Sequence, residues 1–367
     1  MNATQYLHDL GQRLWLDNIS RRHLDEGILQ TYIAEYALTG LTSNPTIFEQ
    51  AIGASGAYDA SIRDGAKGRE TDEALFVAIA LDDLRRAADL FRPIHDSTDG
   101  IDGWVSMEVS PLLAYDAAAT VQAAESIRSL ARRDNLFVKS PGTAQGVQAI
   151  EESIFAGVPV NVTLLFSPAH YRAAAEAYMR GIERRIEAGL APRVGSVASL
   201  FVSRWDRAVS TKVPEALRNR LGIAVAASTY ALYRELLRSE RWRKLAAAGA
   251  APQRLLWAST GTKDPNAPET LYVEALAAPD TINTMPDATL AAFARHGALK
   301  KPLADDGVEA AAMLDRFREA GVDIDALAAQ LQSDGAQAFV ASWQALMRGI
   351  AAKRAGFGAE GGARPTT

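Results

Sequence analysis

The segment L-F-V-K-S-P-G-T, from Leu136 to Thr143, closes a run of strand-forming apolar residues with a single lysine and then turns at once. A lysine whose ammonium group is poorly solvated loses its proton more readily, and the neutral amine is the species that attacks a carbonyl carbon. Lys139 is therefore a candidate Schiff-base nucleophile. The alternative is a lysine at a strand end whose charged head reaches back to water.

Seven more short, strand-forming apolar runs flank this segment along the chain. The eight predicted strands lie at 14–19, 40–44, 104–109, 136–139, 159–166, 194–203, 254–259 and 281–285. The longer segments between them have the periodicity of amphipathic helices. Strands that alternate with helices predict an α/β fold with a parallel sheet, and eight strands are the number that closes such a sheet into a (β/α)8 barrel.

The chain shows no linker that would separate a second domain, so we expect one barrel domain over residues 1–355. Within it, residues 287–355 contain helical patterns but no strand, and they predict a C-terminal helical extension. Phe339, Trp343, Leu346 and Ile350 follow one another at spacings typical of a helix face, which indicates core packing rather than a ligand site. The glycine-rich residues 356–367 are predicted to form a flexible tail.

The composition excludes several classes of protein. A chain of 367 residues with 48% hydrophobic and 23% charged residues falls in the ordinary range of soluble globular proteins. Its 39 basic and 44 acidic residues are interspersed, which argues against a nucleic-acid partner. The absence of cysteine excludes disulfides, thiolate metal sites and cysteine nucleophiles. Neither a signal peptide nor a membrane-spanning run is apparent, so we expect a cytoplasmic protein without a membrane partner.

Reactive polar residues stand at the ends of nearly all the predicted strands, where a barrel of this kind carries its chemistry. They are Asp17, Asn44, Glu108, Lys139, Thr163, Ser199 and Ser259. Each has a structural alternative: Asp17 and Asn44 could cap helices, Glu108 could be a solvated rim residue, and the hydroxyl residues could be ordinary strand or turn residues. Their recurrence at equivalent places on successive strands favours a functional site, because carboxylates are depleted in strands.

Six motifs resemble those of the transaldolase family, in the order in which that family carries them. They are G-L-T-S-N-P-T-I-F (40–48), L-F-V-K-S-P-G-T (136–143), N-V-T-L-L-F-S (161–167), S-L-F-V-S-R (199–204), W-A-S-T-G-T-K (257–263) and A-P-D-T-I-N-T-M-P (278–286). The match runs from about Trp15 to Pro286, and the helical C-terminus is typical of the longer bacterial members. Motifs of this length in this order are a specific signal.

The resemblance implies a class I mechanism in which Lys139 forms a Schiff base with the substrate. Asp17 would act as acid and base at the carbon–carbon bond, and Glu108 and Thr163 would hold and activate the water that enters and leaves the imine. The implied substrate-binding residues are Asn44 and Ser199 for the dihydroxyacetone hydroxyls, Ser259 beside them, and Arg204 and Lys263 for the phosphate.

The resemblance also implies the reaction, a step of the non-oxidative pentose phosphate pathway. A dihydroxyacetone unit would pass from fructose 6-phosphate or sedoheptulose 7-phosphate to erythrose 4-phosphate or glyceraldehyde 3-phosphate. Such chemistry needs no cofactor and no metal, and the five histidines stand at no metal-ligand spacing. The partners would be these phosphorylated sugars, and the protein would be a monomer or a homodimer.

Two positions depart from the common family pattern. Many members carry an arginine shortly after the serine that ends the seventh strand, where this chain has T-G-T-K, and lysine lacks the forked geometry of arginine. Many also have an apolar residue after the lysine, where this chain has Ser140, which should face the opposite side of the strand.

Two other functions remain possible from the sequence. One is a lysine-dependent aldolase of the fructose 6-phosphate aldolase type, which would release free dihydroxyacetone. Glu108 argues against it, because the small aldolases that resemble this family tend to place a tyrosine in the water-activating role. The other is a non-catalytic barrel that binds sugar phosphates, which would be expected to have lost Lys139 or its partners.

Overall fold

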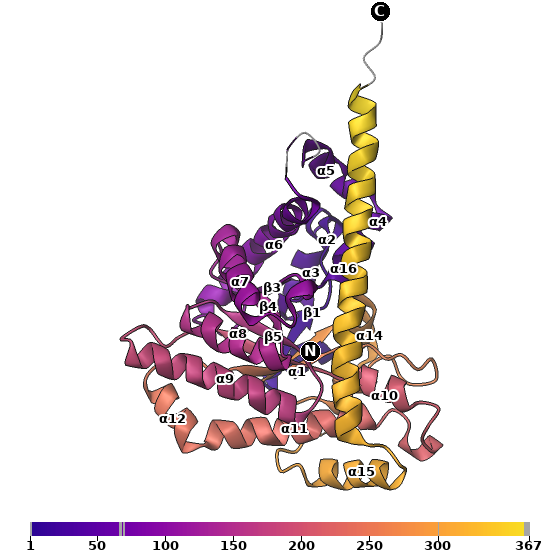
Figure 1. Cartoon of the computed structure of the whole chain (residues 1–367). Coiled ribbons are helices and arrows are strands. Elements are labelled where there is room, and N and C mark those ends of the chain that lie inside the picture. Colours follow the sequence, from indigo (N-terminus) through magenta and orange to yellow (C-terminus); the bar gives the residue numbers. More distant parts are fainter. Residues whose placement is uncertain (1, 66–67, 69, 300, 363–367) are drawn as a thin grey trace, which may run out of the picture.

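The structure, a computed structural model, describes residues 2–65, 68, 70–299 and 301–362. Its parallel strands form a closed barrel in chain order, and β1 pairs with β8 to complete the ring. Figure 1 shows strands such as β1, β3 and β4 among the surrounding helices. The strands are β1 (Arg13–Leu16), β2 (Leu38–Leu41), β3 (Trp104–Glu108), β4 (Leu136–Pro141), β5 (Val160–Leu165), β6 (Ser196–Phe201), β7 (Arg254–Ala258) and β8 (Thr281–Met285). The predicted (β/α)8 barrel is confirmed, and each predicted run contains or overlaps one of these strands, although several strand ends differ, such as that of β2 at Leu41 rather than 44.

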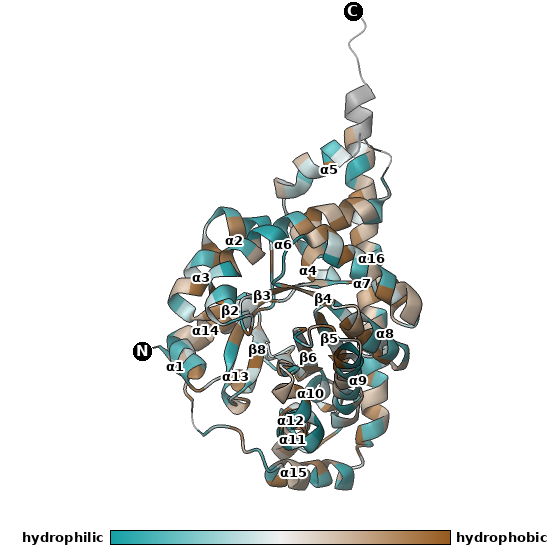
Figure 2. Ribbon diagram, turned by 90° about the vertical axis from the view of Figure 1, so that its left-hand side faces the viewer, coloured by the Kyte–Doolittle hydropathy of each residue, from teal (hydrophilic) through white to brown (hydrophobic). Residues whose placement is uncertain are grey.

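Helices surround the barrel and connect its strands. The α-helices are α1 (Ala3–Asp9), α2 (Arg21–Asp25), α3 (Ile28–Tyr36), α4 (Pro45–Ala54), α5 (Asp59–Gly65), α6 (Asp72–Ser97), α7 (Ala117–Ala131), α8 (Ala144–Phe155), α9 (Pro168–Glu187), α10 (Ser203–Val209), α11 (Leu221–Arg238), α12 (Glu240–Ala247), α13 (Leu271–Ala275), α14 (Asp287–His296), α15 (Val308–Glu319) and α16 (Ile324–Gly362). Short 3₁₀ turns lie at η1 (Gly56–Tyr58), η2 (Pro111–Leu113) and η3 (Glu215–Leu217). In Figure 2 strands such as β3 and β4 are brown, whereas polar residues lie on the outer helices.

Aromatic side chains fill part of the barrel interior. Trp104 stacks on Phe137 with ring centroids 4.0 Å apart, and Trp15 lies 6.1 Å from Phe137 on the other side. Gly40 makes room for this cluster, because a methyl group at that position would lie 2.6 Å from both the Trp15 ring and the Trp104 carbonyl oxygen. The barrel is therefore a packed core rather than a pore, and reactive groups have to lie at its end.

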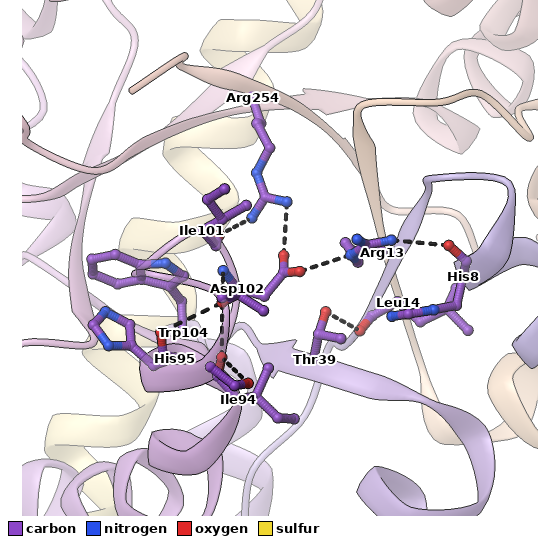
Figure 3. A network of polar contacts seen from close by, with 12 residues as sticks. His8, Arg13, Leu14, Thr39, Ile94, His95, Ile101, Asp102, Trp104 and Arg254 are labelled. Atoms are coloured by element: carbon purple, nitrogen blue, oxygen red, sulfur yellow. Dashed lines mark hydrogen bonds and ion pairs between the residues drawn. The ribbon is translucent and has the colours of Figure 1, made fainter. Parts of the chain in front are cut away.

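A buried ion cluster joins three parts of the barrel at the end where its strands begin (Figure 3). Asp102, just before β3, accepts from Arg13 Nε at 2.7 Å and from Arg254 Nη1 at 2.8 Å, and these arginines are the first residues of β1 and β7. Burial by itself would raise the pKa of Asp102, but the charges and hydrogen bonds of Arg254 and Arg13 outweigh it and hold the pKa below the ordinary carboxyl value. The cluster therefore connects β1, β7 and the start of β3, which lie far apart in the sequence.

We expect Asp102→Asn to lower the free energy of unfolding by about 3–5 kcal/mol at neutral pH, because it leaves the buried Arg254 and the partly buried Arg13 without their counter-charge. A carboxyl with a lowered folded-state pKa contributes stability above its unfolded pKa and loses it as the pH falls through its folded pKa. The difference in free energy of unfolding between the variant and the parent should therefore decrease as the pH is lowered. Urea unfolding from pH 7 downward measures this. Asp134→Asn, at the exposed pair with Arg128, is the control and should change stability by less than about 1 kcal/mol.

The C-terminal helix α16 passes from α15 along the outside of the barrel and packs against α4, α5 and α6 (Figure 1). Trp343, Leu346 and Ile350 are buried in the core between them, as their spacing predicted. The helix continues through Gly362, into the segment predicted as a tail, and residues 363–367 lie outside the described part of the chain. Among the described residues, no helix has both the length and the apolar character that a bilayer crossing requires.

Candidate active site

A cavity of about 90 Å³ lies at the carboxyl ends of the strands and brings most of the predicted site residues together. It is lined by Asp17, Thr42, Asn44, Lys139, Thr163, Ser199, Phe201, Arg204, Ala258, Ser259, Thr284 and Phe339. Glu108 lies beside it in contact with Lys139. Larger cavities, of about 530 Å³ between α11 and α15 and about 970 Å³ between α9 and α11, contain none of the predicted residues.

Lys139 and Glu108 face each other from neighbouring strands. They are register partners on β4 and β3, and Lys139 Nζ lies 3.1 Å from Glu108 Oε2, with each side chain only 6% exposed. Lys139 Nζ also donates to the carbonyl oxygen of Ser43 at 3.2 Å. The predicted alternative, a lysine whose head reaches bulk water, is not what the structure shows.

The environment of Glu108 suits a group that exchanges protons. Burial raises the pKa of Glu108, the charge of Lys139 opposes this rise, and the negative charge of Asp17 adds to it. A carboxyl group with a raised pKa holds a proton more readily than a free one, which suits a group that donates a proton and takes it back. The rim alternative for Glu108 is therefore wrong.

Asp17 and Asn44 differ in their relation to the helices that follow them. Ser20, rather than Asp17, caps α2, and Asp17 Oδ1 instead accepts from Thr42 Oγ1 at 2.8 Å. Asn44 is the N-cap of α4, where its Oδ1 accepts from the N–H of Ile47 at 3.0 Å. Because the cap uses only that oxygen, the amide N–H groups of Asn44 can still donate to a ligand in the cavity.

Thr163 and Ser199 contribute hydroxyl groups from β5 and β6. Thr163 is fully buried, and its Oγ1 has no hydrogen-bond partner within the part of the chain that the structure describes. Ser199 Oγ donates to Asn161 Oδ1 at 2.7 Å, and Asn161 Nδ2 donates to Ser106 Oγ at 3.1 Å. Asn161 therefore positions Ser199, a role that the sequence analysis missed although Asn161 lies on the same face of its strand as Thr163.

Arg204, near the start of α10, supplies the positive charge of the cavity. Its guanidinium lies over the ring of Phe201, 5.0 Å from the centroid, and it forms no ion pair within the described residues. Burial lowers the pKa of Arg204 from its ordinary value, and the nearby charge of Arg207 lowers it further. A partly buried cation that forms no ion pair with a described residue favours an anionic ligand.

Ser259 reaches the cavity but Lys263 does not. Ser259 has a positive φ of 56°, and its Oγ lies 3.0 Å from Ser203 Oγ. Lys263 is exposed and lines a separate cleft of about 330 Å³, together with Arg207 and Arg218. The structure therefore does not bring Lys263 together with Arg204 in one cavity.

Phe339 reaches the cavity from α16, where the sequence analysis placed it only in the core. It is buried, and its ring centroid lies 5.6 Å from Lys139 Nζ and 5.8 Å from the guanidinium carbon of Arg204. Phe339 therefore packs in the core, as predicted, and it also lines the candidate site, which the sequence did not predict. No local pattern distinguishes Phe339 from Trp343, one turn further along the helix, because only the path of α16 decides which of them meets the cavity.

A closed parallel barrel with a buried lysine next to a protonatable carboxyl is typical of the class I aldolase superfamily, whose members act through a lysine Schiff base. The family model described as transaldolase/fructose-6-phosphate aldolase matches residues 14–350. The chain belongs to this family, and the predicted resemblance is confirmed.

Named relatives agree with the family. A transaldolase of Thermobifida fusca (strain YX) is 44% identical over 95% of this chain and 97% of its own length. A transaldolase of Thiobacillus denitrificans is 44% identical over 95% of this chain and 100% of its own length, and one of Frankia alni is 43% identical over 98% and 100%.

Proposed function

We propose that this protein is a transaldolase, which transfers a dihydroxyacetone unit from fructose 6-phosphate or sedoheptulose 7-phosphate to erythrose 4-phosphate or glyceraldehyde 3-phosphate in the cytoplasmic pentose phosphate pathway. The observation that carries the proposal is the buried contact of 3.1 Å between Lys139 Nζ and Glu108 Oε2 at the cavity. The names of the relatives support a transferase rather than an aldolase.

Imine formation and hydrolysis belong to the Lys139 side of the cavity. The neutral amine of Lys139 adds to the ketone carbon of the donor, and the resulting hydroxyl leaves as water to give a protonated imine. Glu108 supplies the proton for this loss and takes it back when water returns, because its raised pKa allows both directions. Thr163 holds this water through its buried hydroxyl, which no described residue satisfies.

Bond cleavage belongs to the Asp17 side. Asp17 removes the proton from the hydroxyl next to the bond that breaks, the aldose leaves, and the electron pair of the broken bond moves into the imine to form an enamine. The enamine then attacks the carbonyl carbon of the acceptor, and Asp17 returns its proton to the new hydroxyl group. Asn44 and Ser199 hold the hydroxyls of the three-carbon unit, with Ser259 beside them.

An assay with and without acceptor tests this function. Consumption of fructose 6-phosphate should depend on erythrose 4-phosphate, because the enamine waits for an aldehyde. Turnover without acceptor and release of free dihydroxyacetone would identify an aldolase instead, and binding without turnover would identify a sugar-phosphate-binding barrel.

Substrate phosphate should bind at Arg204, because this cation lies in the cavity and forms no ion pair with a described residue. We expect Arg204→Ala to raise the KM for fructose 6-phosphate strongly, about 10- to 100-fold for a lost charge-assisted contact, with a smaller effect on unphosphorylated glyceraldehyde as acceptor. Lys263→Ala should have a weaker effect, since Lys263 lies in the neighbouring cleft. Steady-state KM values and inhibition by inorganic phosphate measure both variants. Unchanged values in both would place the phosphate elsewhere.

A further inference from the structure

Gln332 reaches from α16 across the ends of two barrel strands. Its Nε2 donates to the carbonyl oxygen of Gly142 at 3.0 Å, just after β4, and to that of Leu164 at 2.9 Å, within β5. An amide nitrogen has two hydrogens, so both carbonyls can be bound at once. One side chain thus holds together the ends of two neighbouring strands.

The strand segment that Gln332 holds is irregular. Leu164 has a φ of 61°, a left-handed conformation that strains a non-glycine residue. The register of β5 with β6 shifts between Val162 and Leu165, so the ladder is interrupted at this point. Irregularities of this kind re-aim a side chain next to an active site, and they persist only where the surroundings hold them.

The residue that this irregularity re-aims is Thr163. Its carbonyl oxygen accepts from the N–H of Gly142 at 2.7 Å, so Thr163 lies between the two carbonyl groups that Gln332 binds. Its hydroxyl lines the cavity with no partner among the described residues. Gln332 therefore holds the residue after Thr163 and the glycine just after β4 that is hydrogen-bonded to Thr163.

Gly335 allows α16 to come this close. A methyl group at Gly335 would lie 2.9 Å from Leu164 Cδ2 and 3.0 Å from Arg204 Nη1. One turn earlier on the helix Gln332 meets the strand ends, and one turn later Phe339 meets the cavity. Helix α16 therefore forms one side of the candidate site and does not only pack on the outside of the barrel.

We propose that Gln332 is a positioning residue for imine formation: it holds the ends of β4 and β5 so that the Thr163 hydroxyl stays aimed at the water handled with Glu108. The inference rests on the proposed function. It predicts a loss confined to the water-dependent steps, whereas cleavage at Asp17, just after β1, continues once the imine has formed.

The test is a double-mutant cycle read by single-turnover trapping with borohydride and fructose 6-phosphate. Gln332→Met keeps the length of the side chain but removes both donors, and it should slow adduct formation about 10- to 100-fold, the range for a misplaced catalytic group. Thr163→Val should slow it as well. In a protein that already carries Thr163→Val, Gln332→Met should slow adduct formation little further, because Gln332 acts through the hydroxyl group that Thr163→Val has removed.

The matched control is Gln337→Met, an exposed glutamine on the same helix, which should trap at the parent rate. Gln332→Asn, which keeps the donors but shortens the reach, serves as a second variant if Gln332→Met does not fold. Parent-like trapping in a folded Gln332 variant, or an equal loss with and without the Thr163 hydroxyl, would overturn the inference. Failure of the parent itself to trap an adduct would refute the proposed function instead.

Discussion

Lys139→Arg should abolish turnover while the barrel stays folded. Arginine keeps a cation next to Glu108, so the electrostatic balance of the buried pair is retained. Its guanidinium stays protonated, however, and cannot attack a carbonyl carbon. Without a Schiff base the carbon–carbon bond is not cleaved, and we expect no activity above background.

An activity assay measures turnover, and circular dichroism measures whether the variant stays folded. Borohydride trapping with fructose 6-phosphate measures whether a Schiff base forms. In the parent, peptide mapping should find a three-carbon unit on Lys139 and on no other lysine. Lys244→Arg is the matched control, since Lys244 is exposed on α12 and pairs only with Glu240 within the described residues; it should behave as the parent does. An adduct on another lysine, or full activity of Lys139→Arg, would refute the mechanism.

The second large effect is a division of work between two carboxylates. Asp17→Asn and Glu108→Gln should each reduce turnover about 10²- to 10⁴-fold, the usual contribution of general acid–base catalysis. The steps they slow should differ. Asp17 accepts a hydrogen bond from Thr42, whereas Glu108 is the carboxylate that contacts Lys139, so loss of Asp17 should still allow the imine to form. Loss of Glu108 should slow imine formation itself.

Single-turnover trapping separates the two cases. Asp17→Asn should trap a six-carbon adduct at a rate close to that of the parent, because the imine forms but the bond does not break. Glu108→Gln should form any adduct slowly. Asp25→Asn provides a control, because Asp25 pairs at the surface with Arg86. Normal turnover of Asp17→Asn would leave Asp17 with no role beyond its hydrogen bond to Thr42.

The strand pattern was predictable because it depends on local chemistry. Short apolar runs separated by helical segments predict a parallel sheet, and the carboxyl ends of parallel strands converge whatever the details of packing. Lys139, Glu108 and Thr163 were therefore expected to meet, and they do, from β4, β3 and β5. The predicted end of β2 was wrong, since Asn44 caps α4 with Pro45 in its first turn. A cap and a strand end look alike in the sequence.

Lys263 shows where local prediction fails. It lies in the motif W-A-S-T-G-T-K, and the resemblance to the transaldolase family implied that it would bind the phosphate together with Arg204. In the structure, the segment after β7 instead places Lys263 in a separate cleft, which Arg207 and Arg218 also line. The direction of an irregular segment depends on what it packs against, and strand spacing carries no information about that.

By itself, the sequence determined the barrel, the family and the positions of the lysine and the carboxylates, because each depends on short-range pattern and on the geometry of a closed sheet. Only the tertiary structure decided that α16 completes the site. Gln332 binds Gly142 across 190 positions of the chain, and Phe339 faces Lys139 across a similar separation. Both are ordinary helix residues in the sequence. Their role comes from the close approach that Gly335 permits, which is a property of packing between distant segments and of no local motif.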